Sequence, residues 1–198
     1  MSRFTITSPA FEDGDWIPKK HTGIGEDLSP EFHIRGISEK AKSIIILFDD
    51  LDNPIFPEYN HWILWNLPVP KGATEMVIPE GIPSGATIEE LAGVTYVIES
   101  SQAKTATDTK TATDAQKYKA ITAKNVVQGI GFGTHKYRGP CPPVIVRKKH
   151  EYKFTICTVD CFIDLSPKAE KANLLKAVDG HVLQIGELHG FFQRGHKY

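Results

Sequence analysis

The stretch Ser43-Ile44-Ile45-Ile46-Leu47-Phe48-Asp49 has apolar side chains at all of its inner positions, and three of them are isoleucine. A short apolar run between polar residues is typical of a strand that is buried on both faces. His61-Trp62-Ile63-Leu64-Trp65-Asn66-Leu67 has the same character. A third strand is predicted from Glu151 to Asp160, where aromatic and β-branched residues recur. We expect the first two segments to be central and covered.

The rest of the chain predicts a mainly β fold, because its regular segments are short and lie between scattered prolines and glycines. Weaker strand candidates are Arg3 to Thr7, Phe32 to Ile34, Glu75 to Ile78 and Val94 to Ile98. The architecture expected on this pattern is a β domain with late helices packed on one side.

Helix is expected only near the C-terminus. Ser166 followed by Pro167 provides an N-cap and a proline in the first turn, and the apolar face of that helix ends at Val178. A second helix is predicted from His181 to Leu188, since apolar residues recur there at helical spacing.

Composition limits the classes of function. The chain has 198 residues, 23 Lys and Arg against 24 Asp and Glu, and a formal charge of -1. We expect a single domain over residues 1–198, no nucleic-acid partner, and no long-range attraction to an anionic membrane. No apolar segment is long enough for a membrane span or resembles a secretory signal. Three cysteines without a C-x-x-C pair predict reduced thiols, no zinc site and a cytoplasmic location.

Residues 100–116 hold two near-copies of a hexad, Lys104 to Thr109 and Lys110 to Ala115, in which alanine is the only aliphatic residue. Such a segment lacks the side chains to build a core. We expect a surface excursion within a longer variable region, 84–125. A lid or a docking loop is the alternative.

Polar groups gather at the edges of the strong strands, where β scaffolds usually present sites. Asp49-Asp50-Leu51-Asp52-Asn53-Pro54 places three carboxylates within four residues, so at least one is expected to be neutralised by a partner or a ligand. His61 opens an otherwise apolar strand and is either a hydrogen-bonded core residue or a ligand group. The prolines of Tyr137 to Pro143 predict a rigid rim, and His150 and Tyr152 share one face of the next strand.

Together these segments resemble the phosphatidylethanolamine-binding protein family, which includes Raf kinase inhibitor protein and prokaryotic relatives. Asp50-Leu51-Asp52-Asn53-Pro54 is similar to the D-P-D-A-P signature, and His61-Trp62-Ile63-Leu64-Trp65-Asn66-Leu67-Pro68 to the H-W-x-x-W-N-I-P strand. Tyr137-Arg138-Gly139-Pro140-Cys141-Pro142-Pro143 resembles the G-P-C-P-P loop, and His150-Glu151-Tyr152 the H-R-Y motif. Further similar segments in the same order are Thr7 to Phe11, Gly25 to Pro30, Gly180 to Leu183 and Gly190 to Arg194.

The resemblance implies a large antiparallel sheet backed by a second packed sheet, with C-terminal helices beside a small anion pocket. The implied ligand-binding residues are Asp50, Pro54, His61, Gly139, Pro142, Pro143, His150 and Tyr152, with Phe192 near the mouth. Leu51, Asn53 and Glu151 differ from the family pattern. Val144 to Lys149 replaces a glycine-rich link, so the rim is expected to differ in shape and charge.

We expect a non-catalytic, regulatory binding protein without a cofactor or a metal. His61 and His150 would donate to a phosphate-sized anion together with backbone amides near Gly139. Asp50 would orient a histidine or face the ammonium group of a zwitterion such as phosphoethanolamine. Because histidine titrates near 6.5, binding should strengthen as the pH falls from about 7.5 to about 6.

Two other classes of function stay open. Docking to a kinase or a protease, as an inhibitor, would use residues 100–116 and Arg147 to Lys149 as contact surfaces, and lipid head groups would allow peripheral membrane contact. A hydrolase would use acid/base or metal chemistry at Asp50, Asp52, His61 and His150. Cys141 is a weak candidate nucleophile, because it lies between prolines with no helix N-terminus nearby to lower its pKa.

Overall fold

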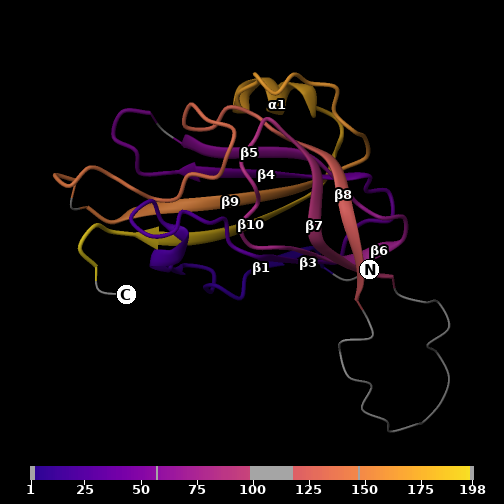
Figure 1. The fold of residues 1–198 in the computed structure, drawn as a ribbon, viewed down its shortest axis with the longest axis horizontal. Helices are drawn as coiled ribbons and strands as arrows, with labels where there is room; N and C mark the ends of the chain where they lie inside the picture. Colours follow the sequence, from indigo (N-terminus) through magenta and orange to yellow (C-terminus); the bar gives the residue numbers. More distant parts are fainter. Residues whose placement is uncertain (1–2, 57, 99–117, 147, 197–198) are drawn as a thin grey trace, which may run out of the picture.

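The structure, a computed structural model, describes residues 3–56, 58–98, 118–146 and 148–196. Within them, ten strands form one sheet in the order β1-β3-β6-β7-β8-β5-β4-β9-β10-β2 (Figure 1). All neighbours are antiparallel except β10 and β2. The elements are β1 (Thr5–Thr7), β2 (Asp15–Trp16), the 3-10 helix η1 (Lys19–His21), β3 (Phe32–Arg35), β4 (Ser43–Asp50), β5 (Tyr59–Pro68), β6 (Ala73–Ile78), β7 (Thr87–Ile98), β8 (Lys119–Gln128), β9 (His150–Val159), α1 (Lys171–Ala177) and β10 (Val182–Phe192).

The three strongest predicted strands are neighbours at the centre of the sheet, as β5, β4 and β9. Phe48 of β4 is in register with Trp62 of β5 and with Phe154 of β9. The rings of Phe48 and Phe154 stack with centroids 4.1 Å apart. Three weaker strand candidates lie within β3, β6 and β7, and the fourth, Arg3 to Thr7, contains β1.

Strand β4 is buried along its whole length, as its sequence predicts. Side chains alternate between the faces of a strand, so Ile44, Ile46 and Phe48 enter the main core. Ile45 and Leu47 point to the other face, into a smaller cluster that α1 and its flanking loops cover. Figure 1 shows α1 lying over β4 and β5.

The second sheet is not found in the described part of the chain, where one sheet curls on itself instead. Strand β1, at one edge of the order, packs against β10 near the other edge. A side chain on Gly186 of β10 would bring its Cβ within 2.6 Å of Ile6 Cγ1 of β1. The main core lies inside this curl. The two ends of one curled sheet therefore cover the core, where a second sheet was expected.

The predicted C-terminal helices are largely wrong. Helix starts at Lys171 rather than beside Ser166, because Ser166 and Pro167 belong to a turn closed by the bond from the Ala169 N–H to the Ser166 carbonyl. Leu174 and Val178 are buried as the helical spacing predicts. One short helix therefore replaces the long first one.

The second predicted helix, His181 to Leu188, is instead part of strand β10 from Val182 onward. Its residues pair with β9 over a long antiparallel ladder, from Gln184 opposite Thr158 to Phe192 opposite His150. The apolar spacing misled because Ile185 points to solvent. Pairing with a central strand outweighs the weak helical preference of this segment.

Strand β8 was not predicted, because much of it lies in the variable region 84–125 and its sequence is polar. Ala123 and Val126 are nevertheless buried, which joins β8 to the core between β7 and β5. Residues 100–116 lie outside the described residues. The described helices include none with the length and apolar character that crossing a bilayer requires.

Candidate functional site

A pocket opens at the end of the central strands where β4 finishes and β5 and β9 begin. Asp50 is in register with Tyr59 and with Tyr152, so the sheet itself brings three distant segments together. The cavity measures about 360 Å³. Its lining consists of Asp50, Asn53, Pro54, Ile55, Phe56, Tyr59, His61, Phe132, Cys141, Pro142, Pro143, Val146, His150 and Tyr152. This volume is within the usual range for small-molecule sites.

His150 and Asp50 form a buried pair at the floor of this pocket. The imidazole Nδ1 is 2.9 Å from Asp50 Oδ2 and 3.1 Å from Oδ1. A carboxylate only accepts, so Nδ1 carries the proton and donates. Asp50 Oδ1 also accepts from the backbone N–H of Asp52, which fixes the carboxylate against the turn.

His61 is held in a similar way by a backbone carbonyl. Its Nδ1 donates to the Arg138 oxygen at 2.8 Å. Burial lowers the pKa of His61, while the Arg138 carbonyl and the charge of Asp50 act in the opposite direction with less effect. His61 is therefore neutral at neutral pH in the free pocket.

Both histidines thus use Nδ1 for structure, and Nε2 is the nitrogen left for chemistry. Neither Nε2 atom has a partner among the residues that the structure describes, and neither is among the fully buried unpartnered atoms. A neutral ring with its proton on Nδ1 accepts at Nε2, whereas a protonated ring donates there. A ligand acceptor such as a phosphate oxygen would therefore need a protonated ring at Nε2, whereas a ligand hydroxyl or ammonium group could donate to a neutral ring.

The proline loop owes its position to residues on other segments. Gly139 donates its N–H to Asp27 Oδ1 at 2.6 Å, and Gly23 donates to the Pro140 carbonyl at 3.0 Å. Arg194 Nε donates to the Pro142 carbonyl at 2.9 Å. Hydrogen bonds to an N-terminal and a C-terminal segment therefore hold the rim, in addition to the stiffness of its prolines.

Seven of the nine implied site residues line one pocket: Asp50, Pro54, His61, Pro142, Pro143, His150 and Tyr152. Gly139 lies outside the lining, packed against the carbonyl of His21, and its N–H already serves Asp27. Phe192 also lies outside, in the core beside His150 in register. The structure thus places these two behind the pocket wall.

Apolar and aromatic side chains were missed by the sequence analysis. Tyr59 and Phe132 pack their rings against His61, with centroids 5.8 and 5.0 Å from its centroid. Ile55 and Phe56 are exposed at the mouth. The signal for Phe132 was its place between two glycines, in a tight turn where its own φ is 50°. These side chains make the wall around the two imidazoles largely apolar.

Each carboxylate of the acidic turn has its own partner, as the expected repulsion requires. Asp50 pairs with His150, and Asp52 accepts from the Glu151 N–H and lies 3.4 Å from Lys148 Nζ. The Glu151 N–H, with help from Lys148, lowers the pKa of Asp52. Asp49 points to the opposite face of the sheet.

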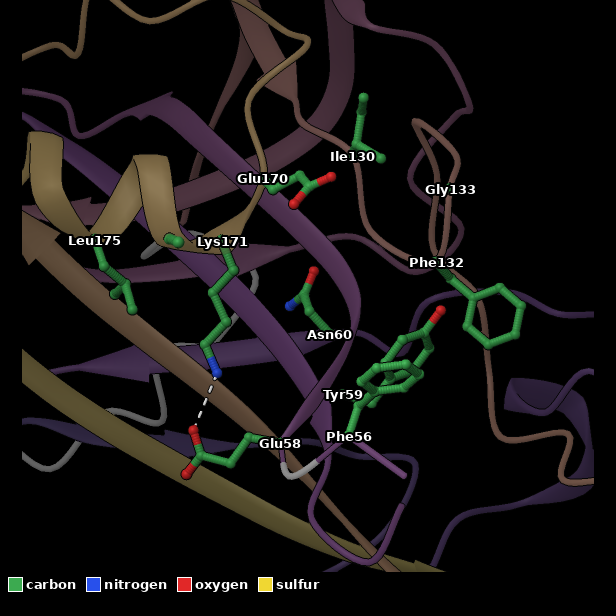
Figure 2. Close-up of a pocket in the computed structure, with 11 residues that line it drawn as sticks. Phe56, Glu58, Tyr59, Asn60, Ile130, Phe132, Gly133, Glu170, Lys171 and Leu175 are labelled. Atoms are coloured by element: carbon green, nitrogen blue, oxygen red, sulfur yellow. Dashed lines mark hydrogen bonds and ion pairs between the residues drawn. The ribbon is translucent and has the colours of Figure 1, made fainter. Parts of the chain in front are cut away.

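Asp49 is bound there by two side chains that line a neighbouring groove of about 530 Å³. Lys171 Nζ of α1 is 3.0 Å from Asp49 Oδ2, and Asn60 donates to Asp49 Oδ1 at 3.0 Å. Figure 2 shows Lys171 reaching Glu58, with Tyr59 and Phe132 farther along the groove. Phe56, Tyr59 and Phe132 line both hollows, so an aromatic wall separates them.

Other chemistry in the pocket is limited by geometry. Cys141 is in the lining, 3.4 Å from Arg194 Nη2, but no histidine of the described residues lies within hydrogen-bond reach of its sulfur. In the described part of the chain, the group of three ligand atoms that lie within 4.8 Å of one another is Asp160, Cys161 and His181, outside this pocket. Burial, and secondarily Asp50, raises the pKa of Tyr152, so that its phenol stays protonated.

The chain is similar to known proteins over nearly its whole length. A family model described as phosphatidylethanolamine-binding protein matches residues 7–193. A UPF0098 protein of Pyrococcus abyssi is 35% identical over 188 residues, 94% of this chain and 84% of that protein. One of Methanothermobacter thermautotrophicus is 31% identical over 193 residues, 96% of this chain and 99% of that protein.

Two solved structures share the fold. A putative phosphatidylethanolamine-binding protein homologue of Chlamydia trachomatis has a TM-score of 0.66 and 25% identity, covering 96% of this chain and 97% of its own. YbcL of Escherichia coli, described as a member of the mammalian PEBP family, has a TM-score of 0.68 and 21% identity, covering 97% and 99%. The similarity to these two solved structures therefore supports the expected mainly β fold, in addition to the strands described above.

Proposed function

Because this chain belongs to the phosphatidylethanolamine-binding protein family, we propose that it is a non-catalytic protein that binds a small phosphate-bearing or zwitterionic ligand, such as a phosphoethanolamine head group, in the pocket of His61 and His150. One observation carries the proposal: both imidazoles have Nδ1 anchored and Nε2 available in the same small, largely apolar cavity. Three unpaired cysteines support a reducing compartment such as the cytosol.

The anchors decide what the ligand must offer. A phosphate dianion brings acceptors only, so it requires protonated rings at His61 and His150. A phosphate that keeps one hydroxyl donates to one Nε2 and accepts from the other. If the ligand is a zwitterion, its ammonium end would face the carboxylate of Asp50, which belongs to the pocket lining. A bound anion favours the charged imidazole, which opposes the effect of burial on His61.

Calorimetric titration with phosphorylethanolamine at pH 7.5 and at pH 6 tests this proposal. We expect tighter binding at the lower pH, because protonation gives donors at Nε2. His150→Ala should weaken binding by about 1–3 kcal/mol, the loss of a charge-assisted hydrogen bond. The matched control is His189→Ala, since His189 also pairs with a carboxylate, Glu151, at 2.7 Å but lies outside the lining.

Equal affinities at both pH values, or equal losses in the two variants, would remove the proposal. Melting curves with and without phosphate separate binding from packing. A His150→Ala protein that melts lower but keeps the full phosphate-induced shift would make His150 a core residue only.

A second candidate function, inhibition of a kinase or a protease by docking, is favoured by the rim. Ile145 is 91% exposed and Val144 68%, on the loop that leads to His150, and Ile55 and Phe56 are exposed on the facing turn. Exposed apolar side chains that gather in one patch with polar residues around them often mark a surface where a partner binds. Lys148 and Lys149 lie beside them.

Inhibition assays on purified kinases and proteases distinguish this candidate from simple ligand binding. Ile145→Ser should reduce any inhibition while leaving phosphate binding unchanged. Ile185→Ser is the matched control, because Ile185 is 61% exposed on β10, away from the pocket lining. If both substitutions reduce inhibition equally, or neither does, the rim is not a docking surface.

A further inference from the structure

A second group of ligating side chains lies at the end of β9 opposite to the pocket. Asp160 and Cys161 directly follow β9, and His181 directly precedes β10. One carboxylate oxygen, the sulfur and one ring nitrogen all lie within 4.8 Å of one another. Asp160 and Cys161 are partly buried, and His181 is exposed. Three different ligand types thus meet where the segment between β9 and β10 leaves and rejoins the sheet.

The backbone fixes this group. The Asp160 N–H donates to the His181 carbonyl at 3.2 Å, and Val159 is in register with Val182 in the next pair of the sheet. Ser43 Oγ donates to the Cys161 carbonyl at 2.6 Å, which ties the cysteine to β4. The relative positions of the three side chains therefore follow from the sheet.

We propose that Asp160, Cys161 and His181 bind a zinc ion, with water as the fourth ligand. Thiolate, imidazole and carboxylate are the protein ligands of zinc, and at its bond lengths neighbouring ligand atoms lie about 3.3–3.6 Å apart in a tetrahedron. The present separations need changes of about 1 Å to reach that geometry. Mixed sulfur and nitrogen ligands favour zinc over magnesium or calcium, which prefer oxygen.

A hydrogen bond already joins two of the three side chains. His181 Nδ1 lies 2.8 Å from Asp160 Oδ1, so an ion at that nitrogen would take the place of the proton between them.

A metal here would close the segment that carries α1. Asp160 and His181 are 21 positions apart, and α1 lies between them. Lys171 of that helix contacts Asp49 and Glu58, so a metal that holds this segment would also stabilise the groove beside the pocket. Because the fold brings the three ligands together, a zinc ion would bind the folded protein more tightly than the open chain and raise the melting temperature.

Equilibrium dialysis against Zn²⁺, followed by elemental analysis, tests the site on the full chain. We expect about one zinc per chain and a higher melting temperature than in EDTA. Co²⁺ in its place should give a sulfur-to-metal charge-transfer band in the near ultraviolet, because Cys161 supplies a thiolate.

Cys161→Ser and His181→Ala should abolish the cobalt band and weaken zinc binding by more than the roughly 10- to 100-fold that an outer-shell substitution costs. The matched controls are Cys141→Ser and His189→Ala, which change a cysteine outside the group and another carboxylate-bound histidine. Melting in EDTA establishes that each variant folds. Retention of zinc in Cys161→Ser, or its absence from the unsubstituted protein, would overturn the proposal without affecting phosphate binding at the pocket.

Discussion

Strand β9 has an aspartate–histidine pair at each end, and the two pairs differ in burial far more than in length. His150 Nδ1 and Asp50 Oδ2 are 2.9 Å apart, with side chains 4% and 5% exposed. His181 Nδ1 and Asp160 Oδ1 are 2.8 Å apart, with side chains 49% and 44% exposed. Water screens the second pair and not the first. Surroundings, rather than contact distance, therefore decide what such a pair contributes.

The surroundings also decide what each pair does. At the buried end, aromatic rings and prolines enclose the pair, so its orientation is fixed and its free nitrogen faces a pocket. At the exposed end, Cys161 adds a third ligand atom and solvent has access. The first arrangement suits a preorganised anion site, and the second suits an ion that arrives from solution.

Asp50→Ala, at the buried pair, is expected to cause the largest loss of stability. It leaves the buried Nδ1 of His150 and the N–H of Asp52 without their acceptor. We expect a loss of about 2–4 kcal/mol in the free energy of unfolding, between the cost of an unpaired buried donor and that of a broken buried ion pair. Urea denaturation measures it. Asp50→Asn, which keeps an acceptor and the shape, should lose less; equal losses would show that hydrogen bonding is not the cause.

Lys171→Met tests the other buried carboxylate at the same end. It leaves Asp49 with the Asn60 amide as its remaining side-chain partner among the described residues. The expected loss in the free energy of unfolding is about 1.5–3 kcal/mol, the range for hydrogen bonds to charged groups. Lys176→Met on the exposed side of α1 is the control and should change stability little. A similar loss in both variants would mean that helix propensity, not Asp49, is responsible.

The central strands were predictable because burial on both faces leaves a signal in the sequence. Ile44 to Phe48 has no polar residue to place in solvent, so only a covered strand suits it. Strand β10 was not predictable, because Ile185 is exposed and Gly186 is dictated by the approach of Ile6. Its state follows from a neighbour far away in the sequence.

The candidate site divides in the same way. Asp50, His61 and His150 were found because each opens or ends a strong strand beside unusual polar residues. Gly139 was assigned to the pocket, yet its N–H serves Asp27, a pairing that no local pattern reveals. Likewise, the three cysteines form no C-x-x-C pair, so the sequence predicted no metal where the sheet register brings His181 beside Cys161.

The pH dependence of stability should report on His61, which lines the pocket at the buried end of β9. Burial lowers the pKa of His61 in the folded protein, so below the ordinary value near 6.5 the unfolded chain takes up protons that the folded one does not. Stability should therefore fall as the pH drops from 7 to 5, by at most about 1.4 kcal/mol per pH unit for this one proton. Urea midpoints of His61→Gln should depend less on pH. A variant with an unchanged slope would contradict the assignment.

Asp160→Ala in EDTA should have the smallest effect, although the bond it removes is the shorter one. An exposed ion pair contributes about 0–1 kcal/mol, and its Coulombic part fades in 1 M salt because screening then acts over about 3 Å. Urea midpoints at low and high salt measure both features. A loss as large as that of Asp50→Ala would mean that burial does not separate the two pairs. With Zn²⁺ present the loss should grow, since the substitution then removes a metal ligand as well as a solvated contact.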